Sequence, residues 1–154
     1  MQRCLAIALL LALPAFAEPW SIDLGSDTAE PSLGFGWSHG ESGTNRTFRW
    51  MDRLEADIWF ESDGGSEVEL ALNAAPMYLA WKRQVIGVYV NGRFIAEWRC
   101  PDDPEFHDYS VTLPAGTLKP GRNRLTLRLG YHRRVPPDTR EVGLAVHRIS
   151  ITPR

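Results

Sequence analysis

The sequence is poor in cysteine, in long apolar runs and in clustered positive charge. Its 154 residues include only two cysteines, Cys4 and Cys100. The apolar run at 5–13 is too short to cross a bilayer core of about 30 Å as a helix. A long basic run, which nucleic-acid partners generally require, is also missing. We therefore expect no membrane anchor and no nucleic-acid partner.

The first residues have the pattern of an export signal. Arg3 precedes the apolar run, and Ala15 and Ala17 have the small-residue spacing that signal peptidase recognises. We expect residues 1–17 to be removed and the mature chain, 18–154, to be periplasmic or secreted. That chain has 16 basic and 19 acidic residues, a formal charge of −3, and is long enough for a single domain.

Cys100 is the one cysteine that remains after the expected cleavage. An internal disulfide is therefore excluded, and stability must come from the hydrophobic core. We interpret Cys100 as a small buried hydrophobic residue and expect a monomer. The alternative is an exposed thiol that forms an intermolecular bond.

Apolar residues recur with period two, and no window of a dozen residues carries an apolar stripe at helical spacing. Alternation is clear in four segments, 53–60, 67–73, 109–113 and 125–129. Asn91-Gly92 joins 84–90 to 93–99 and predicts a two-residue hairpin, because both residues accept positive φ. Near His147 the apolar phase slips, which predicts either a bulge or a strand buried on both faces.

Gly- and Pro-rich turns separate these segments, and the pattern predicts an all-β fold, a two-sheet antiparallel β-sandwich. The stretch 88–129 reads V-x-V-N-G-x-x-I, then Y-x-V-x-L-P, then L-K-x-G-x-N-x-L-x-L. It resembles the galactose-binding-like jelly roll of carbohydrate-binding modules and of sugar-binding domains in glycoside hydrolases.

A second resemblance extends over more of the chain. Its residues are Gly36-Trp37-Ser38, Glu41 and Arg49-Trp50, followed by Asp138-x-Arg140-x-x-Gly143 before the last strand. They are similar to small sandwich modules appended to bacterial glycosyltransferases and other cell-surface polysaccharide proteins. Together the two patterns cover about 34–152 and imply fold more strongly than function.

Residues 36–40 satisfy the G-x-S-x-G pattern of a serine-hydrolase nucleophile elbow, with Asp138 and His147 following Ser38 in the required order. That elbow needs a strand that turns into a helix, and nothing after Gly40 has helical periodicity. Paired carboxylates for glycoside hydrolysis also need a fixed separation that sequence does not give. We therefore expect that the protein is not an enzyme. A hydrolase is kept as the third hypothesis, after the two binding functions described below.

An acidic run offers oxygen ligands on a proline-bounded loop: Asp102, Asp103, Glu105 and Asp108. Calcium prefers such ligands, and the jelly-roll resemblance implies that structural calcium is common in these modules. The spacing matches no EF-hand loop, and acidic loops are usually only solvated. We predict no cofactor and keep these four residues as weak calcium candidates.

Four charged residues fall in the two motif regions of the second resemblance: Glu41, Arg49, Asp138 and Arg140. Carboxylates and guanidinium groups form bidentate pairs, and partly buried charges need partners. We predict a structural ionic network that ties the front loop to the last strand. A ligand-contacting cluster is the alternative.

Aromatic side chains provide the remaining clue, because sugar rings stack on Trp and Tyr. Trp50 and Trp98 share the phase of apolar neighbours and are expected in the core, whereas Trp59 is expected on the wet face. The predicted ligand-binding residues lie in loops: Trp37, Trp81, Tyr131, Arg133 and Arg134.

The leading hypothesis is an exported, non-catalytic module that binds a glycan through rim loops. Its ligand could be a cell-envelope polysaccharide, preferably acidic because of Arg133 and Arg134. The alternative is a structural or protein-interaction subunit with an envelope protein as its partner, using a sheet face or an edge strand.

Overall fold

The computed structural model describes residues 18–134 and 136–154. The predicted export signal at 1–17 lies outside these residues. Within the described ranges no helix is long and apolar enough to cross a membrane. Strands dominate them, and one short 3-10 helix, η1 (Asp27–Ser32), follows the first strand.

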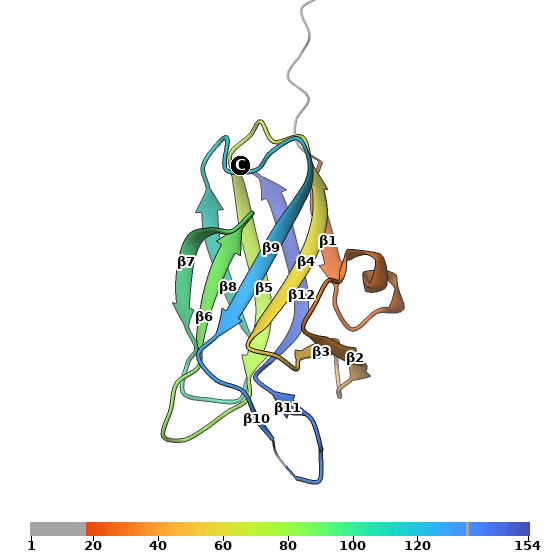
Figure 1. The fold of residues 1–154 in the computed structure, drawn as a ribbon, viewed down its shortest axis with the longest axis vertical. Coiled ribbons are helices and arrows are strands. Elements are labelled where there is room, and N and C mark those ends of the chain that lie inside the picture. Colours follow the sequence, from red (N-terminus) through yellow and green to blue (C-terminus); the bar gives the residue numbers. More distant parts are fainter. Residues whose placement is uncertain (1–17, 135) are drawn as a thin grey trace, which may run out of the picture.

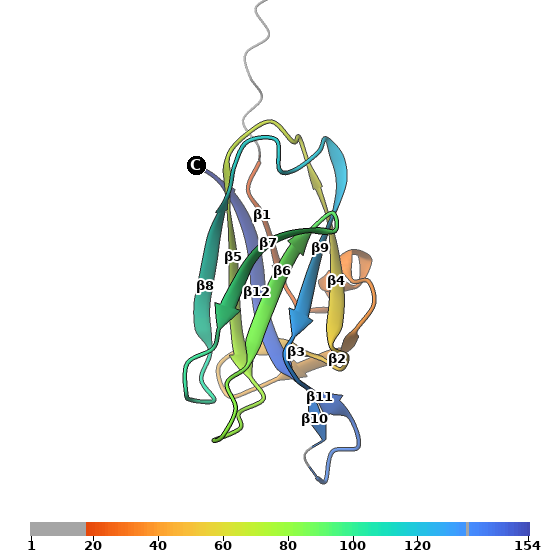
Figure 2. The ribbon, with the colours of Figure 1, turned by 60° about the vertical axis from the view of Figure 1, so that its left-hand side comes forward.

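The strands form two antiparallel sheets packed face to face, which confirms the predicted β-sandwich (Figures 1 and 2). The larger sheet has the order β2-β3-β12-β5-β8, and β1 also pairs with β12. Its strands are β1 (Trp20–Asp23), β2 (Trp37–Ser42), β3 (Thr47–Met51), β5 (Val68–Pro76), β8 (His107–Leu113) and β12 (Leu144–Pro153). The smaller sheet has the order β4-β9-β6-β7, with β4 (Glu55–Ser62), β6 (Val85–Val90), β7 (Arg93–Arg99) and β9 (Gly121–Leu129). A separate two-residue ladder joins β10 (Arg133–Arg134) to β11 (Glu141–Val142).

Alternate residues of the central strands fill the space between the sheets. Leu70 and Leu72 of β5 and Leu125 and Leu127 of β9 are each 1% exposed. Their burial removes apolar surface from water at about 25 cal/mol per Å². Leu54 departs from the expected pattern, because the strand begins at Glu55 and Leu54 lies in the exposed crossing between the sheets.

The hairpin predicted at Asn91-Gly92 is confirmed. Both residues have positive φ, 51° and 82°, and they join β6 directly to β7. The Asn91 side chain also binds β9: its carbonyl accepts from the Arg124 N–H at 2.9 Å, and its amide donates to Asn123 at 2.8 Å. The turn is therefore fixed to a third strand of the same sheet.

A bulge interrupts β12 at His147, which confirms one of the two predicted explanations for the phase slip. The β12–β5 register jumps there, so that Val146 pairs with Ala74 but Arg148 pairs with Asn73. The other neighbour of β12 changes at the same point, from β3 to β1. The bulge thus marks the place where two strands diverge on one side of β12.

Cys100 is 1% exposed and carries a free thiol, as predicted for a buried residue. Burial raises the pKa of the thiol, so the reactive thiolate is disfavoured. The expected monomer stays a prediction.

Candidate functional site

The predicted loop residues are only partly brought together. Trp81 lies in the tight turn between Leu79 and Lys82 and is 73% exposed. The Arg133 guanidinium lies 5.2 Å from the centre of its ring. Arg134 is the next residue of the same strand, and successive side chains of a strand point to opposite faces. Arg133 therefore accompanies Trp81, whereas Arg134 lines a separate hollow that also contains Arg140.

Tyr131 does not present its ring as a surface contact, contrary to our prediction. It is 8% exposed, and its hydroxyl lies 2.7 Å from the Met77 carbonyl and 3.3 Å from that of Lys82. Burial raises the pKa of this hydroxyl. Gln84 donates to the Tyr131 carbonyl at 2.8 Å. Tyr131 is therefore fixed at its backbone, and its hydroxyl holds the Trp81 turn in place.

Trp37 also lies apart from the Trp81 turn. It begins β2 rather than a loop, and Figures 1 and 2 both place β2 away from the 77–84 segment. Its indole N–H donates to the Asp57 carbonyl at 2.8 Å, and its ring packs against the core. Trp37 therefore attaches β2 to β4 and is not a loop residue as predicted. Sequence left open whether Trp37, Trp81 and Tyr131 converge, and the structure places Trp37 apart from the other two.

Three of the four predicted network residues meet. Arg140 binds Asp138 through two guanidinium nitrogens, at 3.0 and 2.6 Å, and Glu41 at 2.7 Å. The hydrogen bonds from Arg140 lower the pKa of Asp138 to about 2. This cluster joins β2 to the segment before β11.

Arg49 belongs to a different cluster, contrary to the prediction. Its guanidinium is buried and donates to the carbonyls of Leu24 and Ser38, both at 2.9 Å, while a third nitrogen lies 2.9 Å from the Glu30 carboxylate. These bonds tie the end of β1, β2 and η1 to β3.

The hydrolase residues do not form a triad. Ser38 lies within β2, and its hydroxyl donates to the carbonyl of the next residue at 3.2 Å. Asp138 binds Arg140, and Nδ1 of His147 lies 2.7 Å from the Thr47 carbonyl. Ser38 thus lacks both the strand-to-helix elbow and the base that activate a serine nucleophile.

Three of the four acidic side chains of the calcium hypothesis bind separate partners. Asp102 pairs with Arg83 at 3.2 Å, and Asp103 accepts from His107 at 2.7 Å and from the Glu105 N–H at 2.9 Å. Asp108 accepts from an asparagine of β5 at 2.7 Å. Across 18–134 and 136–154, no three His, Cys, Asp or Glu residues are grouped to hold a metal ion.

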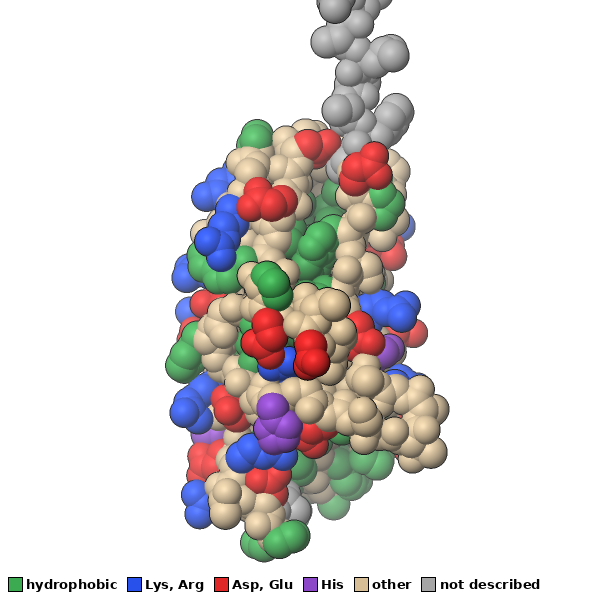
Figure 3. Space-filling model, turned by 90° about the vertical axis from the view of Figure 1, so that its right-hand side faces the viewer, with side chains coloured by type: hydrophobic (Ala, Val, Ile, Leu, Met, Phe, Trp, Pro, Cys, Tyr) green, Lys and Arg blue, Asp and Glu red, His purple; other side chains and the backbone are tan. Residues whose placement is uncertain are grey.

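A hollow that sequence reasoning missed lies where β1, at the edge of the larger sheet, faces β4, at the edge of the smaller one. Its volume is about 400 Å³. Figure 3, which views this side, shows hydrophobic side chains recessed between the bordering segments. We call it the β1–β4 hollow, and its lining is Trp20, Pro31, Ser32, Trp59, Phe60, Glu61 and Arg122.

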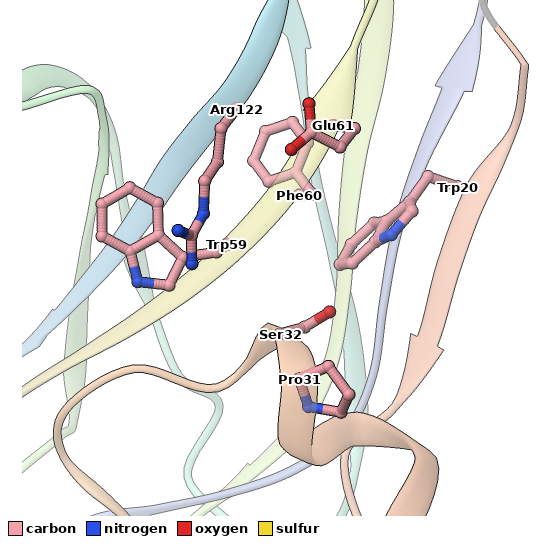
Figure 4. A pocket seen from close by; sticks show the side chains of 7 residues that line it. All are labelled: Trp20, Pro31, Ser32, Trp59, Phe60, Glu61 and Arg122. Atoms are coloured by element: carbon pink, nitrogen blue, oxygen red, sulfur yellow. The ribbon is translucent and has the colours of Figure 1, made fainter.

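Two tryptophans form opposite walls of the β1–β4 hollow, and Phe60 lies between them (Figure 4). The Trp20 ring lies 5.4 Å from that of Phe60. The Arg122 guanidinium lies 4.4 Å from the centre of the Trp59 ring, which holds both planar groups in place. Ser32 and Glu61 stand beside the aromatic rings, and Arg122 lies over the Trp59 ring.

The helix η1 sets the floor of this hollow, and local sequence explains its position. Ser26 caps it by accepting from the Thr28 N–H at 3.2 Å, and Ala29 is fully buried in the core. Glu30 pairs with Arg49, which fixes the far side of the same turn. The arrangement presents aromatic surface and hydrogen-bonding groups to one concave site.

No family model matches the chain, and no curated protein matches its sequence. Solved structures do match its fold. A family 35 carbohydrate-binding module from Clostridium thermocellum has a TM-score of 0.56 at 10% identity, covering 89% of this chain and 99% of that one. The C-terminal CBM6 of LamC, a marine laminarinase from Zobellia galactanivorans, has a TM-score of 0.55 at 13% identity, covering 88% and 99%.

A third similar structure is the GH26-CBM35 β-(1,4)-mannanase of Podospora anserina, with a TM-score of 0.53 at 16% identity. The match covers 88% of this chain but only 28% of the mannanase. These likenesses concern fold, and they confirm the resemblance predicted from the motifs. The chain has the jelly-roll β-sandwich fold of carbohydrate-binding modules.

Proposed function

We propose that this chain is a non-catalytic module that binds a polysaccharide in the β1–β4 hollow. The observation that carries the proposal is the pair of tryptophan walls, Trp20 and Trp59, with charged groups at their border (Figure 4). The apolar faces of a sugar ring pack on aromatic walls, while its hydroxyls need donors and acceptors beside them. Glu61 accepts hydrogen bonds and Arg122 donates them.

Size and rigidity also support this site. A volume of about 400 Å³ lies within the range of roughly 300–1,000 Å³ for small-molecule sites. Its walls belong to strands and to the anchored helix η1, so little order must be gained on binding. The Trp81 turn offers one exposed ring with Arg133 beside it, and we assign it a secondary role, in which Arg133 would favour an acidic polysaccharide.

The proposal includes export and a role at the cell envelope, where polysaccharides are abundant. Protein recovered from the periplasm or culture fluid of expressing cells should begin at Glu18 by mass spectrometry. That material should be retarded in native gels that contain one of mannan, laminarin, galactan or xylan. These polymers are chosen because the similar structures include a mannanase, a galactanase, a laminarinase module and a xylanase domain.

Variants locate the binding site in the same gels. Trp20→Ala should weaken binding at least tenfold, equivalent to about 1.4 kcal/mol. Glu61→Gln removes a charge from an exposed side chain and tests the same site without touching the core. Trp81→Ala is the matched control and should retain most of the affinity. If none of these polymers, nor the acidic polymers alginate and polygalacturonate, retards the protein, the proposal fails and an envelope-protein partner becomes the better hypothesis.

A further inference from the structure

The bulge at His147 creates a second hollow, on the outer face of the larger sheet. It lies beside the loop that joins β2 to β3 and reaches across β12 and β5 to β8. Its volume is about 260 Å³. We call it the bulge pocket, and its lining is entirely polar: Asn45, Arg46, Asn73, Asp108, His147 and Arg148.

The backbone explains why a hollow forms there. β3 pairs with β12 only as far as Val146, and β1 begins its pairing at Arg148. Between them the His147 carbonyl accepts from the Leu24 N–H at 2.8 Å. Because the neighbouring strand changes at the bulge, the sheet surface is indented, and bulges commonly re-aim side chains in this way.

The polar side chains are held in a fixed arrangement before any ligand binds. Arg46 donates to the side-chain oxygen Oδ1 of Asn73 at 3.1 Å, and the side-chain nitrogen Nδ2 of Asn73 donates to Asp108 at 2.7 Å. The Arg46 guanidinium also lies 4.7 Å from the centre of the Phe106 ring. One hydrogen-bonded row therefore links the β2–β3 loop to β5 and β8.

The hydrogen-bonded row still has acceptors and donors that a ligand could bind. Asp108 accepts at one oxygen, and no donor within 18–134 or 136–154 bonds its second oxygen, which can accept from a ligand. The Thr47 carbonyl can only accept, so Nδ1 of His147 carries a proton and its ring is held in a fixed orientation at the edge of the row. Arg46 retains further N–H groups, and Arg148 adds more at the border of the pocket.

We propose that the bulge pocket is a second carbohydrate site, which binds adjacent hydroxyl groups of a neutral sugar residue. A pair of hydroxyls both donates and accepts, and the pocket offers acceptors beside donors within one rigid row. Arg46 and Arg148 also line the pocket, so its charge alone does not select the ligand. An anionic group, however, has no donor for the second oxygen of Asp108, whereas a pair of hydroxyls has one, and neutral sugars therefore fit the row better than phosphate or acidic sugars. This inference rests on the proposed function, because both sites take the same class of ligand.

The test is an NMR titration of the mature protein, labelled with ¹⁵N, with the methyl glycosides of mannose, galactose, xylose and glucuronic acid, each added separately to millimolar concentration. At least one neutral glycoside should shift the side-chain amide signals of Asn45 and Asn73 in a saturable manner. Methyl glucuronide should shift them less.

Asp108→Ala should weaken this binding at least tenfold, and Arg148→Ala provides a second variant that leaves the hydrogen-bonded row intact. Ser110→Ala is the matched control, because Ser110 lies two residues from Asp108 on the same face of β8 but outside the pocket. Melting temperatures of all three variants check that the fold is retained.

The outcomes separate the two hypotheses. If the Asn45 and Asn73 signals stay fixed with every neutral glycoside while Trp20→Ala weakens polysaccharide binding at least tenfold, the second site is wrong and the proposed function stands. The second site is also wrong if glucuronide binds best, or if Ser110→Ala weakens binding as much as Asp108→Ala. If polysaccharide binding fails while the bulge pocket still binds a neutral glycoside, the assignment to the β1–β4 hollow is wrong instead.

Discussion

Arg49 illustrates how a single buried charge organises the front of the sandwich. Residues of β3 alternate, and Arg49 and Met51 face inward while Trp50 lies on the outer face against Phe48. The sequence pattern predicted the reverse for Trp50, because it shares the phase of apolar neighbours. The inward position is instead taken by an arginine, a residue type that is rarely buried. The guanidinium is stable inside because its nitrogens reach two carbonyls and a carboxylate.

We predict that Arg49→Ala destabilises the protein by about 3 kcal/mol, because it leaves buried carbonyls without a donor and opens a cavity. Chemical denaturation would measure the change. Arg53→Ala is the control, since Arg53 is exposed and its hydrogen bond and ion pair are made with its chain neighbour Asp52, and it should cost less than about 0.5 kcal/mol. Equal losses for the two variants would show that Arg49 contributes no more than a surface charge.

At the scale of elements, the sequence predicted those features that depend on residues close together in the chain. Alternation located the inward residues of β5 and β9, and the Asn91-Gly92 pair located the β6–β7 turn, because both depend on residues close in sequence. The phase slip at His147 also located a bulge. The phase slip did not predict the bulge pocket, because this hollow depends on the pairing of β12 with β1 and β3, which are distant in the chain.

The turn glycines give a test at this scale. Gly92 and Gly64 both have positive φ, 82° and 79°, which an alanine adopts only with strain. A Cβ on Gly92 would meet open space, so Gly92→Ala should cost about 1 kcal/mol from backbone strain alone. A Cβ on Gly64 would lie 2.5 Å from the Pro120 nitrogen, so Gly64→Ala should cost at least about 2 kcal/mol.

Gly65→Ala is the internal control for these two variants. Its Cβ would also meet open space, and its φ lies outside the positive region, so its effect should stay within about 0.5 kcal/mol. Thermal or urea unfolding of the three variants would measure the order. If Gly92→Ala is as mild as Gly65→Ala, the hairpin does not depend on left-handed backbone.

At the scale of the whole molecule, the β1–β4 hollow exists because the two sheets part along one edge. Its residues come from β1, η1, β4 and β9, so Trp20 and Arg122 meet although about a hundred residues separate them. Periodicity assigned Trp59 to the wet face correctly but gave no sign of the other wall. Tyr131 and Trp37 were predicted to bind the ligand for a related reason, since sequence does not show that both side chains form hydrogen bonds within the fold.

The most direct test of the central claim uses the six tryptophans as internal reporters. Indole N–H signals of the labelled protein would be followed by NMR while the polysaccharide that retards it in gels is added as an oligosaccharide. The account predicts saturable shifts for Trp20 and Trp59, with Trp37 unchanged because its N–H is already bonded to the Asp57 carbonyl. Shifts at Trp81 alone, with Trp20 and Trp59 unmoved at saturation, would contradict it.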